Sequence, residues 1–421
     1  MTSSSDIASY PAYVERFLTE TLVDSMDEAR VVALLGARQS GKSTLVRSLA
    51  TETLGARYVT LDDASVLSLA TTDPTGFLED SGRPLIIDEI QRAPGLLLAI
   101  KSRVDRANAR GQYLITGSAD LRRLSTVPDA LPGRVDYLTL WPFTQGELLG
   151  KEDRFLDLLF EGKVPTSPRP PVGRAAYAEM LLRGGYPEAQ QRTARSRAQF
   201  FESYVQSIVE RDVPETSRIH DPFAITNLLR LIAARSGSIA RYERLGRDLG
   251  IDGKTAKSYV EVLDRLYLVR IRKAWHRNLG KRQAKAPKLY VADTGLLAGL
   301  IGIDADRIAT DGGVAEAMFE TFVTTELERQ SSWAAEQCSF WHLRDDGREV
   351  GLIAERRNGE IAGIEVKSGA TVRARDFAGL KWLRDNSGDR FRGGAVVYPG
   401  DQPLQFGDRL WAVPLDAIWR S

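Results

Sequence analysis

The sequence has 421 residues, 43% of them hydrophobic, which is enough for about two to four domains with cores of their own. Basic and acidic side chains balance, with 57 Lys and Arg against 56 Asp and Glu, so any nucleic-acid binding must come from a local patch. The single cysteine, Cys338, excludes an intrachain disulfide and a Cys-based zinc site. No apolar run is long enough to span a membrane and no signal-peptide pattern is visible, so we expect a cytoplasmic protein without a membrane partner.

The first informative stretch is an apolar run, Val31–Leu35, followed by a glycine-rich loop. The run predicts a buried parallel strand, and GARQSGKS matches the phosphate-binding pattern G-x-x-x-x-G-K-[ST], with a helix expected over residues 44–50. Glycines allow backbone N–H groups to surround an anion, and a helix N-terminus attracts phosphate. We expect Lys42 to neutralise the β- and γ-phosphates of ATP and the Ser43 hydroxyl to bind Mg²⁺. The predicted nucleotide-binding residues of this loop are Gly36, Ala37, Arg38, Gln39, Ser40, Gly41, Lys42, Ser43 and Thr44.

A second apolar run, residues 84–87, ends in Asp88 and Glu89, which is a Walker B pattern. Mg²⁺ prefers one or two carboxylates plus water and phosphate, so Asp88 is predicted to hold the ion. Glu89 is predicted to orient or deprotonate the attacking water. A further strand, residues 112–117, ends in small polar residues, and either Thr116 or Ser118 could sense the γ-phosphate; a Ser/Thr helix cap is the alternative.

The motifs together resemble a widespread prokaryotic family of AAA-type ATPases that carry a C-terminal domain long described as of unknown function. The resemblance rests on segments in order: GARQSGKSTL, LIIDEIQRAPGLLLAIKSRVD, LITGSAD, LPGR and LWPFTQGEL. It extends over nearly the whole chain through LRGGYPE, ERDV, KLYVADTGLLAGLIG and EVGLIAERRNGEIAGIEVKSG. It implies an ATPase core, and leaves the biological role undefined.

The resemblance also suggests roles for three arginines, Arg134, Arg183 and Arg211. Arg134 precedes the strand after the sensor, where an arginine of AAA+ ATPases reaches the nucleotide of a neighbouring subunit. Arg183 is open to two interpretations, a second sensor or a structural arginine. Arg211 and Asp212 fit a structural ion pair.

The middle of the chain has the pattern of a helix-turn-helix. Helices are expected over residues 225–234, 241–250 and 254–266, with a strand over 267–271 like the wing of a winged helix. The third helix would be the recognition helix. From Tyr267 to Lys288 the chain is basic with no acidic residue, which suits phosphate contacts; a solvated face or a protein-binding winged helix is the alternative. The predicted DNA-binding residues are Lys254, Thr255, Lys257, Ser258, Arg270, Arg272, Lys273, Arg277, Lys281 and Arg282.

The C-terminal part is similar to the PD-(D/E)xK nuclease arrangement. Glu365 and Lys367 are two residues apart on a predicted strand and therefore face the same side, and Glu320 could add a ligand from the preceding helix. The resembling pattern is E-V-D before the turn, but here Gly351 occupies the Asp position, and Glu349 lies roughly 7 Å further along the strand. We predict a degenerate nuclease-like domain; residual metal-dependent DNA cleavage coupled to ATP is the alternative.

We therefore predict an α/β protein with a P-loop AAA+ ATPase core built on a parallel sheet, a helical and winged-helix middle region, and a C-terminal α/β nuclease-like domain. The predicted boundaries are 1–165 for the ATPase, 166–220 for a helical lid or linker, 221–285 for the winged helix and 286–421 for the nuclease-like domain. The predicted function is ATP hydrolysis with Mg²⁺ by a homo-oligomer, and a hexameric ring is one possible form. This assembly is predicted to translocate on, unwind or remodel duplex or branched DNA. The alternative is a nucleotide-dependent switch that binds a protein partner in stress or defence, without motor activity.

Overall fold

The computed structural model describes residues 13–79, 84–107, 109–120, 133–151, 153–165, 172–216, 221–277, 282, 285–345 and 347–420. These residues form two compact units, and both are discontinuous in the sequence. The P-loop unit comprises residues 18–142 and 201–301, and the six-strand unit comprises the remainder. The division of the sequence into four consecutive domains stays a prediction.

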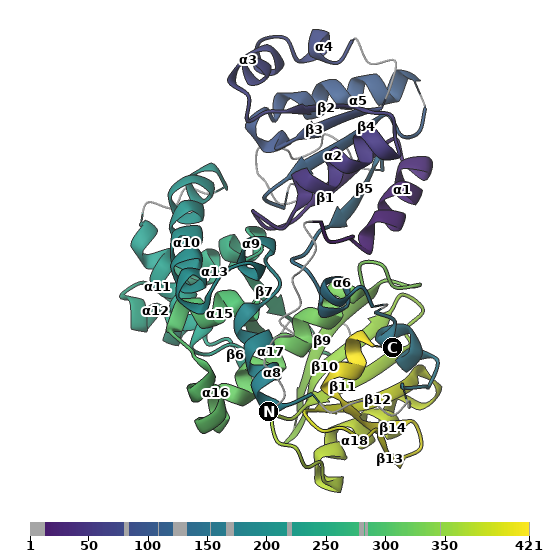
Figure 1. Ribbon diagram of the computed structural model, residues 1–421, viewed down its shortest axis with the longest axis vertical. Helices are drawn as coiled ribbons and strands as arrows, with labels where there is room; N and C mark the ends of the chain where they lie inside the picture. Colours follow the sequence, from purple (N-terminus) through teal and green to yellow (C-terminus); the bar gives the residue numbers. More distant parts are fainter. Residues whose placement is uncertain are drawn as a thin grey trace, which may run out of the picture. The chain divides into compact units, whose positions relative to one another are not determined.

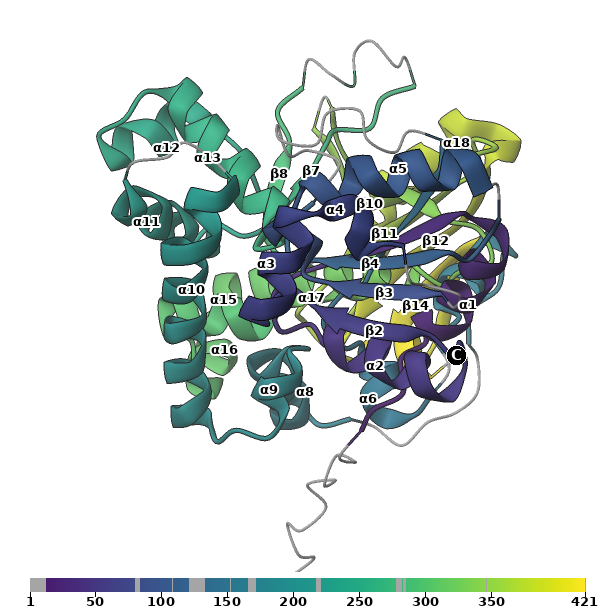
Figure 2. The same cartoon turned by 90° about the horizontal axis from the view of Figure 1, so that it is seen from above.

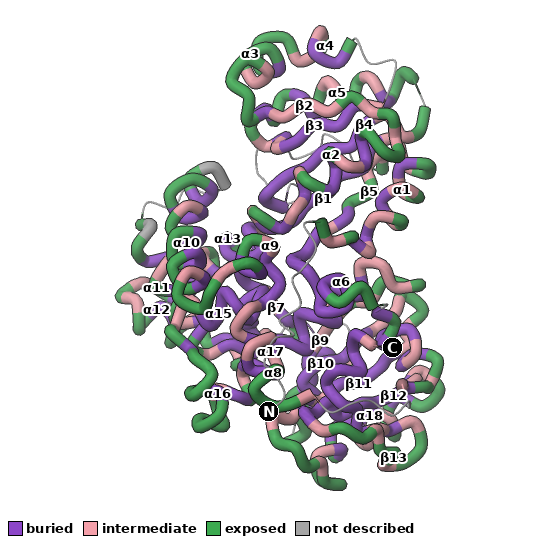
Figure 3. The backbone as a smooth tube through the Cα atoms, in the orientation of Figure 1, coloured by how far each residue is buried: buried purple, intermediate pink, exposed green. Residues whose placement is uncertain are grey.

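A five-stranded parallel sheet is the centre of the P-loop unit. Its strand order is β2-β3-β4-β1-β5, and Figure 2 shows β2, β3 and β4 as neighbouring arrows. The strands are β1 (Val31–Leu35), β2 (Arg57–Thr60), β3 (Leu85–Asp88), β4 (Tyr113–Gly117) and β5 (Val135–Thr139). The strand predicted over Val31–Leu35 is confirmed. Every residue of β1, β3 and β4 is buried, as Figure 3 shows, because parallel strands are covered on both faces.

Helices connect these strands, as parallel strands require. The connecting elements are α1 (Leu18–Glu28), α2 (Lys42–Glu52), α3 (Ala64–Thr72), α4 (Pro74–Phe77), the 3₁₀ turn η1 (Ile90–Arg92) and α5 (Gly95–Ala107). In α2 the apolar residues Leu45, Val46 and Leu49 recur at helical spacing and are buried, and the helix packs against β2 and β3. The expected helix over residues 44–50 is therefore present and extends beyond both ends of the prediction.

The rest of the P-loop unit is a group of helices with a small sheet (Figure 1). It contains the part of α10 (Ala194–Thr216) from Phe201 onward, α11 (Pro222–Ala233), α12 (Tyr242–Leu249), α13 (Gly253–Arg265) and α15 (Thr294–Ile301). The strands β6 (Ser238–Ile239), β7 (Val269–Arg272) and β8 (Lys288–Val291) pair antiparallel in the order β6-β8-β7. The helices expected in this region are thus present, followed by the expected strand.

The six-strand unit is built on a mixed sheet of order β13-β14-β12-β11-β10-β9. Its strands are β9 (Cys338–Asp345), β10 (Arg348–Arg356), β11 (Ile361–Val366), β12 (Phe391–Tyr398), β13 (Leu404–Gly407) and β14 (Leu410–Pro414). Its helices are α6 (Gln145–Leu149), α7 (Phe155–Phe160), α8 (Arg174–Arg183), α9 (Pro187–Gln190), the first part of α10, α16 (Ala305–Thr310), α17 (Gly312–Gln330), α18 (Ala378–Ser387) and the 3₁₀ turns η3 (Ala374–Phe377), η4 (Gly388–Arg390) and η5 (Leu415–Trp419).

Glycines on β12 allow helices to approach both faces of this sheet. A Cβ on Gly393 would lie 2.6 Å from the Leu159 backbone oxygen of α7, and one on Gly394 would lie 3.6 Å from Cβ of Leu380 on α18. Successive strand residues point to opposite faces, so α7 and α18 cover opposite sides of the sheet. The unit is therefore an α/β structure in three layers.

Candidate functional site: a phosphate-binding loop and its partners

The glycine-rich loop follows β1 directly and ends at the N-terminus of α2. Gly36 has φ +152°, and a Cβ there would lie 2.2 Å from the backbone oxygen of Leu140, so any side chain would clash. Gly41, the residue before α2, has φ 98°, a left-handed conformation that glycine adopts without strain. No side chain caps α2 at Gly41, so the N–H groups of its first turn are left for an anion. The loop has the backbone geometry that phosphate binding requires.

Lys42 lies inside this loop. Its side chain is buried, and Nζ donates hydrogen bonds to the backbone oxygens of Gly36 at 3.0 Å and Ala37 at 2.8 Å. Burial lowers the pKa of Lys42, while the negative charges of Glu89 and Asp88 act in the opposite direction. The structure thus brings the predicted phosphate-binding lysine and both Walker B acids into one electrostatic site.

Asp88, the last residue of β3, is held by hydrogen bonds to both of its carboxylate oxygens. Tyr58 Oη of β2 donates to Oδ2 at 2.8 Å, and Thr116 Oγ1 of β4 donates to Oδ1. Burial raises the pKa of Tyr58, and its hydrogen bond to Asp88 acts in the same direction, so the phenol remains a donor. The two neighbouring strands therefore fix the orientation of this carboxylate.

Glu89 has φ 60°, a conformation that residues other than glycine seldom adopt. Its backbone N–H donates to Thr116 Oγ1 at 3.0 Å. Its carboxylate accepts a hydrogen bond from Gln91 Nε2, and the same nitrogen donates to Ser118 Oγ at 2.9 Å. Gln91 therefore joins the predicted catalytic base to the end of β4, where the sequence predicted a sensor. Both Thr116 and Ser118 belong to this network.

Sequence reasoning missed three members of this site, Tyr58, Gln91 and Asp212. Asp212 pairs with Arg38 of the loop, with Arg38 Nε 2.6 Å from Asp212 Oδ2. The sequence could not predict this pair because Arg38 and Asp212 are far apart along the chain and meet only through the packing of α10. A signal for Gln91 was present, since it lies two residues after Glu89 in the motif LIIDEIQ.

Arg134 lies at the opposite edge of the sheet from its own loop. β5 pairs with β1 in parallel register, Val31 opposite Val135 and Leu35 opposite Thr139, so Arg134 lies at the amino end of the strands. Its guanidinium forms a two-pronged ion pair with Asp105 of α5, in which Nη2 donates to Oδ2 at 3.0 Å. The Arg134 hydrogen bond lowers the pKa of the Asp105 carboxyl. Arg183, offered as a second sensor, pairs with Glu179 at 3.1 Å.

The predicted DNA-binding residues fall into two groups. Lys254, Lys257 and Ser258 in the first turns of α13 are exposed, and Thr255 beside them donates to Asp252 Oδ2 at 2.5 Å. The basic run after α13, predicted to contact phosphate, is exposed only in part. Its exposed members are Lys273 and Arg277, its engaged or buried members are Arg270, Arg272 and Arg282, and Lys281 lies outside the described residues.

The engaged arginines are stabilised by aromatic rings and protein oxygens. Arg270 pairs with Asp264 at 3.3 Å and lies over the Trp141 ring at 4.8 Å. Arg282 lies over Trp275 and donates to the His276 backbone oxygen at 2.6 Å. Stacking and hydrogen bonding compensate the burial of a guanidinium, which is why these arginines of a basic segment can lie inside the fold.

Of the residues predicted for a degenerate nuclease site, the structure brings Glu320 and Glu365 close to Gly351 in the six-strand unit. A Cβ on Gly351 of β10 would lie 3.6 Å from Glu320 Oε1 of α17 and 3.8 Å from Glu365 Oε2 of β11. The Gly351 N–H donates to Glu365 Oε1 at 3.1 Å. Glu349 is exposed, and Lys367 follows the end of β11. Within the described ranges, no group of three or more His, Cys, Asp or Glu side chains could hold a metal ion.

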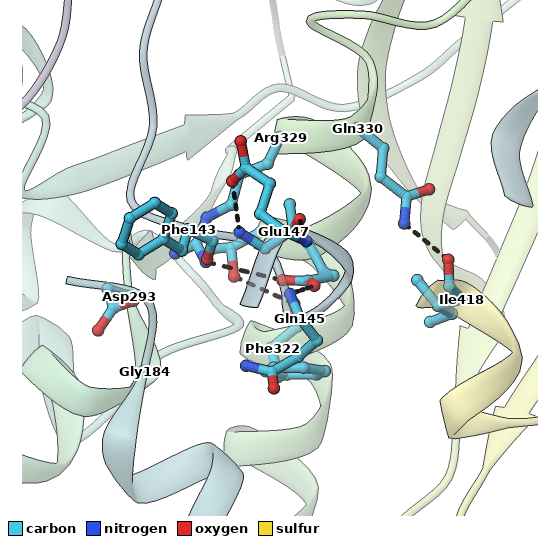
Figure 4. Close-up of polar contacts among 12 residues, drawn as sticks. Phe143, Gln145, Glu147, Gly184, Asp293, Phe322, Arg329, Gln330 and Ile418 are labelled. Carbon is cyan, nitrogen blue, oxygen red and sulfur yellow. Dashed lines mark hydrogen bonds and ion pairs between the residues drawn. The ribbon is translucent and has the colours of Figure 1, made fainter. Parts of the chain in front are cut away.

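A buried polar cluster lies elsewhere in the six-strand unit (Figure 4). Arg16 Nε is 2.9 Å from Glu147 Oε1, and Arg329 Nη1 is 3.6 Å from Glu326 Oε2, with all four side chains at most 4% exposed. The Glu326 carboxylate accepts a hydrogen bond from the Gln145 N–H. Asp153 is buried against Gly146, and burial together with the charges of Glu326 and Glu147 raises its pKa to about 9.

Strand order, loop and acids together define a P-loop nucleotide-binding protein with an AAA-type core. Residues 28–149 match the family described as AAA domain, and residues 174–307 and 315–418 match two families described as domains of unknown function, DUF8612 and DUF4143. Two uncharacterized proteins, Rv2008c of Mycobacterium tuberculosis and Mb2031c of Mycobacterium bovis, are each 30% identical over 399 residues, which is 94% of this chain and 82% of each relative. The chain belongs to their family, AAA-type ATPases that carry domains of unknown function.

Solved structures have lower sequence identity to this chain. The Walker-type ATPase PABY2304 of Pyrococcus abyssi is 15% identical, with a TM-score of 0.41, over 67% of this chain and 94% of its own. RuvB of Thermotoga maritima, a Holliday junction branch migration motor, is 14% identical, with a TM-score of 0.27, over 61% of this chain and 89% of its own. In the part of the chain that the structure describes, no helix is both long and apolar enough to cross a membrane.

Proposed function

We propose that this protein hydrolyses ATP with Mg²⁺. The proposal rests on one observation, that Lys42, Asp88 and Glu89 meet at the carboxyl edge of a parallel sheet. Lys42 would neutralise phosphate charge, and Asp88 with Ser43 would hold the ion, a donor set that suits Mg²⁺ because it leaves room for water and phosphate oxygens. When bound, Mg²⁺ supplies charge neutralisation on the phosphates. Glu89, oriented by Gln91, would accept a proton from the attacking water.

The test is phosphate release from ATP by the full chain. Lys42→Ala should lower turnover by at least about 100-fold, the size of effect that follows loss of one preorganised charge-stabilising group. Lys151→Ala, which removes an exposed lysine of the six-strand unit, is the matched control and should leave turnover unchanged. Full activity in Lys42→Ala would contradict the assignment of the site.

We further propose that the active form is a homo-oligomer in which Arg134 completes the site of another copy. Arg134 precedes β5 while the loop follows β1, so five residues of strand, about 17 Å, separate their two edges of the sheet. An arginine at that distance from its own loop suits action in trans. An arginine supplied in trans stabilises the charge that develops during phosphoryl transfer.

Mixing two inactive variants tests this arrangement. Arg134→Ala and Lys42→Ala should each be inactive alone, whereas a mixed assembly contains subunit contacts with an intact Lys42 facing an intact Arg134. Recovery of part of the wild-type turnover on mixing is expected. If every mixing ratio stays inactive although native mass shows mixed assemblies, Arg134 does not act in trans.

DNA is the partner that the middle region supports best. Three helices, α11 to α13, followed by antiparallel β7 and β8, are similar to a winged helix. Lys254, Lys257 and Ser258 are exposed in the first turns of α13, the position from which recognition helices contact DNA. Lys273 and Arg277 are exposed after β7 and would contact phosphate. ATP turnover would then drive movement on, or remodelling of, duplex or branched DNA.

Fluorescence anisotropy with duplex and branched DNA, together with ATP turnover in its presence, tests the DNA role. Replacing Lys254 and Lys257 by Gln should weaken binding and reduce its salt dependence, because fewer counterions are released. Replacing Arg106 and Arg110 removes the same charge from another exposed part of the P-loop unit and is the matched control. Absence of binding and of stimulation across all DNA structures would exclude DNA as the partner.

A nucleotide-dependent switch that binds a protein is the second candidate, and two observations favour it. Asp252 and Glu243 place their carboxylates at the N-terminus of α13, where they would repel a DNA phosphate. Phe223, at the start of α11, is 82% exposed, which suits an apolar partner. DNA-independent turnover would support this candidate.

For the six-strand unit we propose a nuclease-like fold that does not cleave DNA. Glu320 and Glu365 flank Gly351, which has no side chain to complete a metal site. Incubation of branched and linear DNA with Mg²⁺ or Mn²⁺ should therefore give no cleavage. Wild-type cleavage that Glu365→Ala abolishes would overturn this proposal.

A further inference from the structure

One helix outside the parallel sheet contacts the phosphate-binding loop at two points. Asp212 of α10 accepts a hydrogen bond from Arg38 Nε at 2.6 Å, and its carboxylate is 5% exposed while the Arg38 side chain is 31% exposed. Tyr204, eight residues earlier on α10, donates from Oη to the backbone oxygen of Arg38 at 3.1 Å. Eight residues are close to two full turns, so both side chains lie on one face of α10.

These contacts differ from an ordinary surface ion pair. An exposed pair contributes little because both ends remain hydrated, whereas Asp212 is withdrawn from water and needs Arg38 to compensate. Tyr204 holds the backbone of the same loop residue, so side chain and main chain of Arg38 are fixed together. Charges on Arg38 and Asp212 also reach Lys42, with opposite effects on its pKa. The loop's conformation therefore depends on α10.

We propose that Asp212 and Tyr204 are positioning residues for ATP binding and hydrolysis, which act through Arg38 and couple the phosphate-binding loop to α10. Because α10 leads in sequence to α11, α12 and α13, the same contacts give the nucleotide a route to the helices proposed to bind DNA. The inference rests on the proposed ATPase function and adds to it the connection between loop and partner-binding region.

The experiment compares Asp212→Asn and Tyr204→Phe with Arg211→Gln, a matched control that removes the neighbouring exposed charge on α10. For each, KM and kcat for ATP, affinity for a fluorescent ATP analogue and the thermal unfolding midpoint are measured. Asp212→Asn should raise KM about tenfold, the size of effect expected for residues coupled in one network. Tyr204→Phe should give a smaller rise, and Arg211→Gln none.

Two further readouts separate coupling from a merely structural role. In wild type, ATP analogue should change amide hydrogen exchange in α10, and Asp212→Asn should lose this response. Charge exchange, Arg38→Asp with Asp212→Arg, should recover part of the affinity that Asp212→Arg alone loses. If Asp212→Asn does not fold, Arg38→Gln removes the same hydrogen bond from its more exposed end and is measured instead.

The outcomes distinguish this inference from the function beneath it. Wild type that neither binds nor hydrolyses ATP would refute the proposed ATPase. An active wild type whose KM, analogue affinity and α10 exchange response are unchanged in Asp212→Asn and Arg38→Gln would refute the coupling alone. A lowered unfolding midpoint with unchanged KM would assign the contacts to stability and likewise overturn the inference.

Discussion

The phosphate-binding site and the carboxylate group around Gly351 are both built at strands that bring distant residues together, yet only the first has a full set of chemical groups. In the P-loop unit Lys42, Asp88 and Glu89 are present, and Tyr58, Thr116 and Gln91 orient the acids. In the six-strand unit Glu320 and Glu365 lie on either side of a glycine that offers only its N–H.

The two places differ in the side chains they offer, and not in whether residues distant in the sequence meet. The pairing of β10 with β11 places Gly351 beside Glu365, and the Glu365 side chain accepts a hydrogen bond from the Gly351 N–H at 3.1 Å. The carboxylates of Glu320 and Glu365, without a third at Gly351, do not make the ligand set that a divalent ion needs. Gly351 itself adds no carboxylate to Glu320 and Glu365.

The largest expected effect comes from replacing Glu89, the proposed general base of the nucleotide site. Glu89→Gln should lower ATP turnover by about 100-fold or more while ATP binding persists, because Gln can keep the hydrogen bond from Gln91 but cannot accept the proton. Turnover and analogue binding are measured on the same preparation. Arg92→Gln, an exposed neighbour paired with Asp62, is the control. Turnover close to wild type in Glu89→Gln would remove Glu89 as the base.

The next expected effect comes from adding a carboxylate at Gly351, between Glu320 and Glu365. A Cβ on Gly351 would have ordinary van der Waals separations of 3.6 to 3.8 Å from its neighbours, so Gly351→Asp should fold and place a third carboxylate beside Glu320 and Glu365. Isothermal titration with Mn²⁺ should show one added site in this variant. Gly351→Ala, which adds the Cβ alone, should show none. Equal Mn²⁺ binding by both variants would contradict the assignment of Gly351 as the missing ligand position.

A smaller effect is expected at the residue that orients the base. Gln91→Ala should lower kcat about tenfold with little change in KM, because ATP does not need Gln91 to bind but Glu89 loses its partner. Gln91→Glu should be worse, since two carboxylates would then repel each other. Steady-state kinetics check this, and a change confined to KM would show that Gln91 contributes to nucleotide binding instead.

The last prediction concerns stability and not activity, at a place with no proposed catalytic role, the polar cluster of the six-strand unit. Asp153 has a pKa of about 9 in the fold against 3.8 when unfolded, so the folded state holds a proton that the unfolded state releases. Stability therefore falls as the pH rises between these values, by up to about 1.4 kcal/mol per pH unit. Asp153→Asn should remove this dependence, raising the unfolding midpoint relative to wild type more at pH 8 than at pH 5. An equal difference at both pH values would show that Asp153 is ionised in the fold.

Much of the nucleotide site could be predicted because its residues are close together in the sequence. The loop from Gly36 to Ser43 and the pair Asp88-Glu89 each form one local motif attached to a strand, and both were located where the structure has them. The basic run after α13 was predicted less well. Composition predicts charge but not exposure, and Arg272 and Arg282 are buried.

The sequence by itself determined the parallel core, the phosphate-binding loop and the absence of a side chain at Gly351, because local periodicity, local motifs and residue identity need no tertiary information. Only the tertiary structure decided the partners: Asp212 for Arg38, Asp105 for Arg134, and Glu320 beside Gly351. Each pair joins residues at least 29 positions apart. Their meeting depends on how helices pack, which the pattern of either segment alone does not contain.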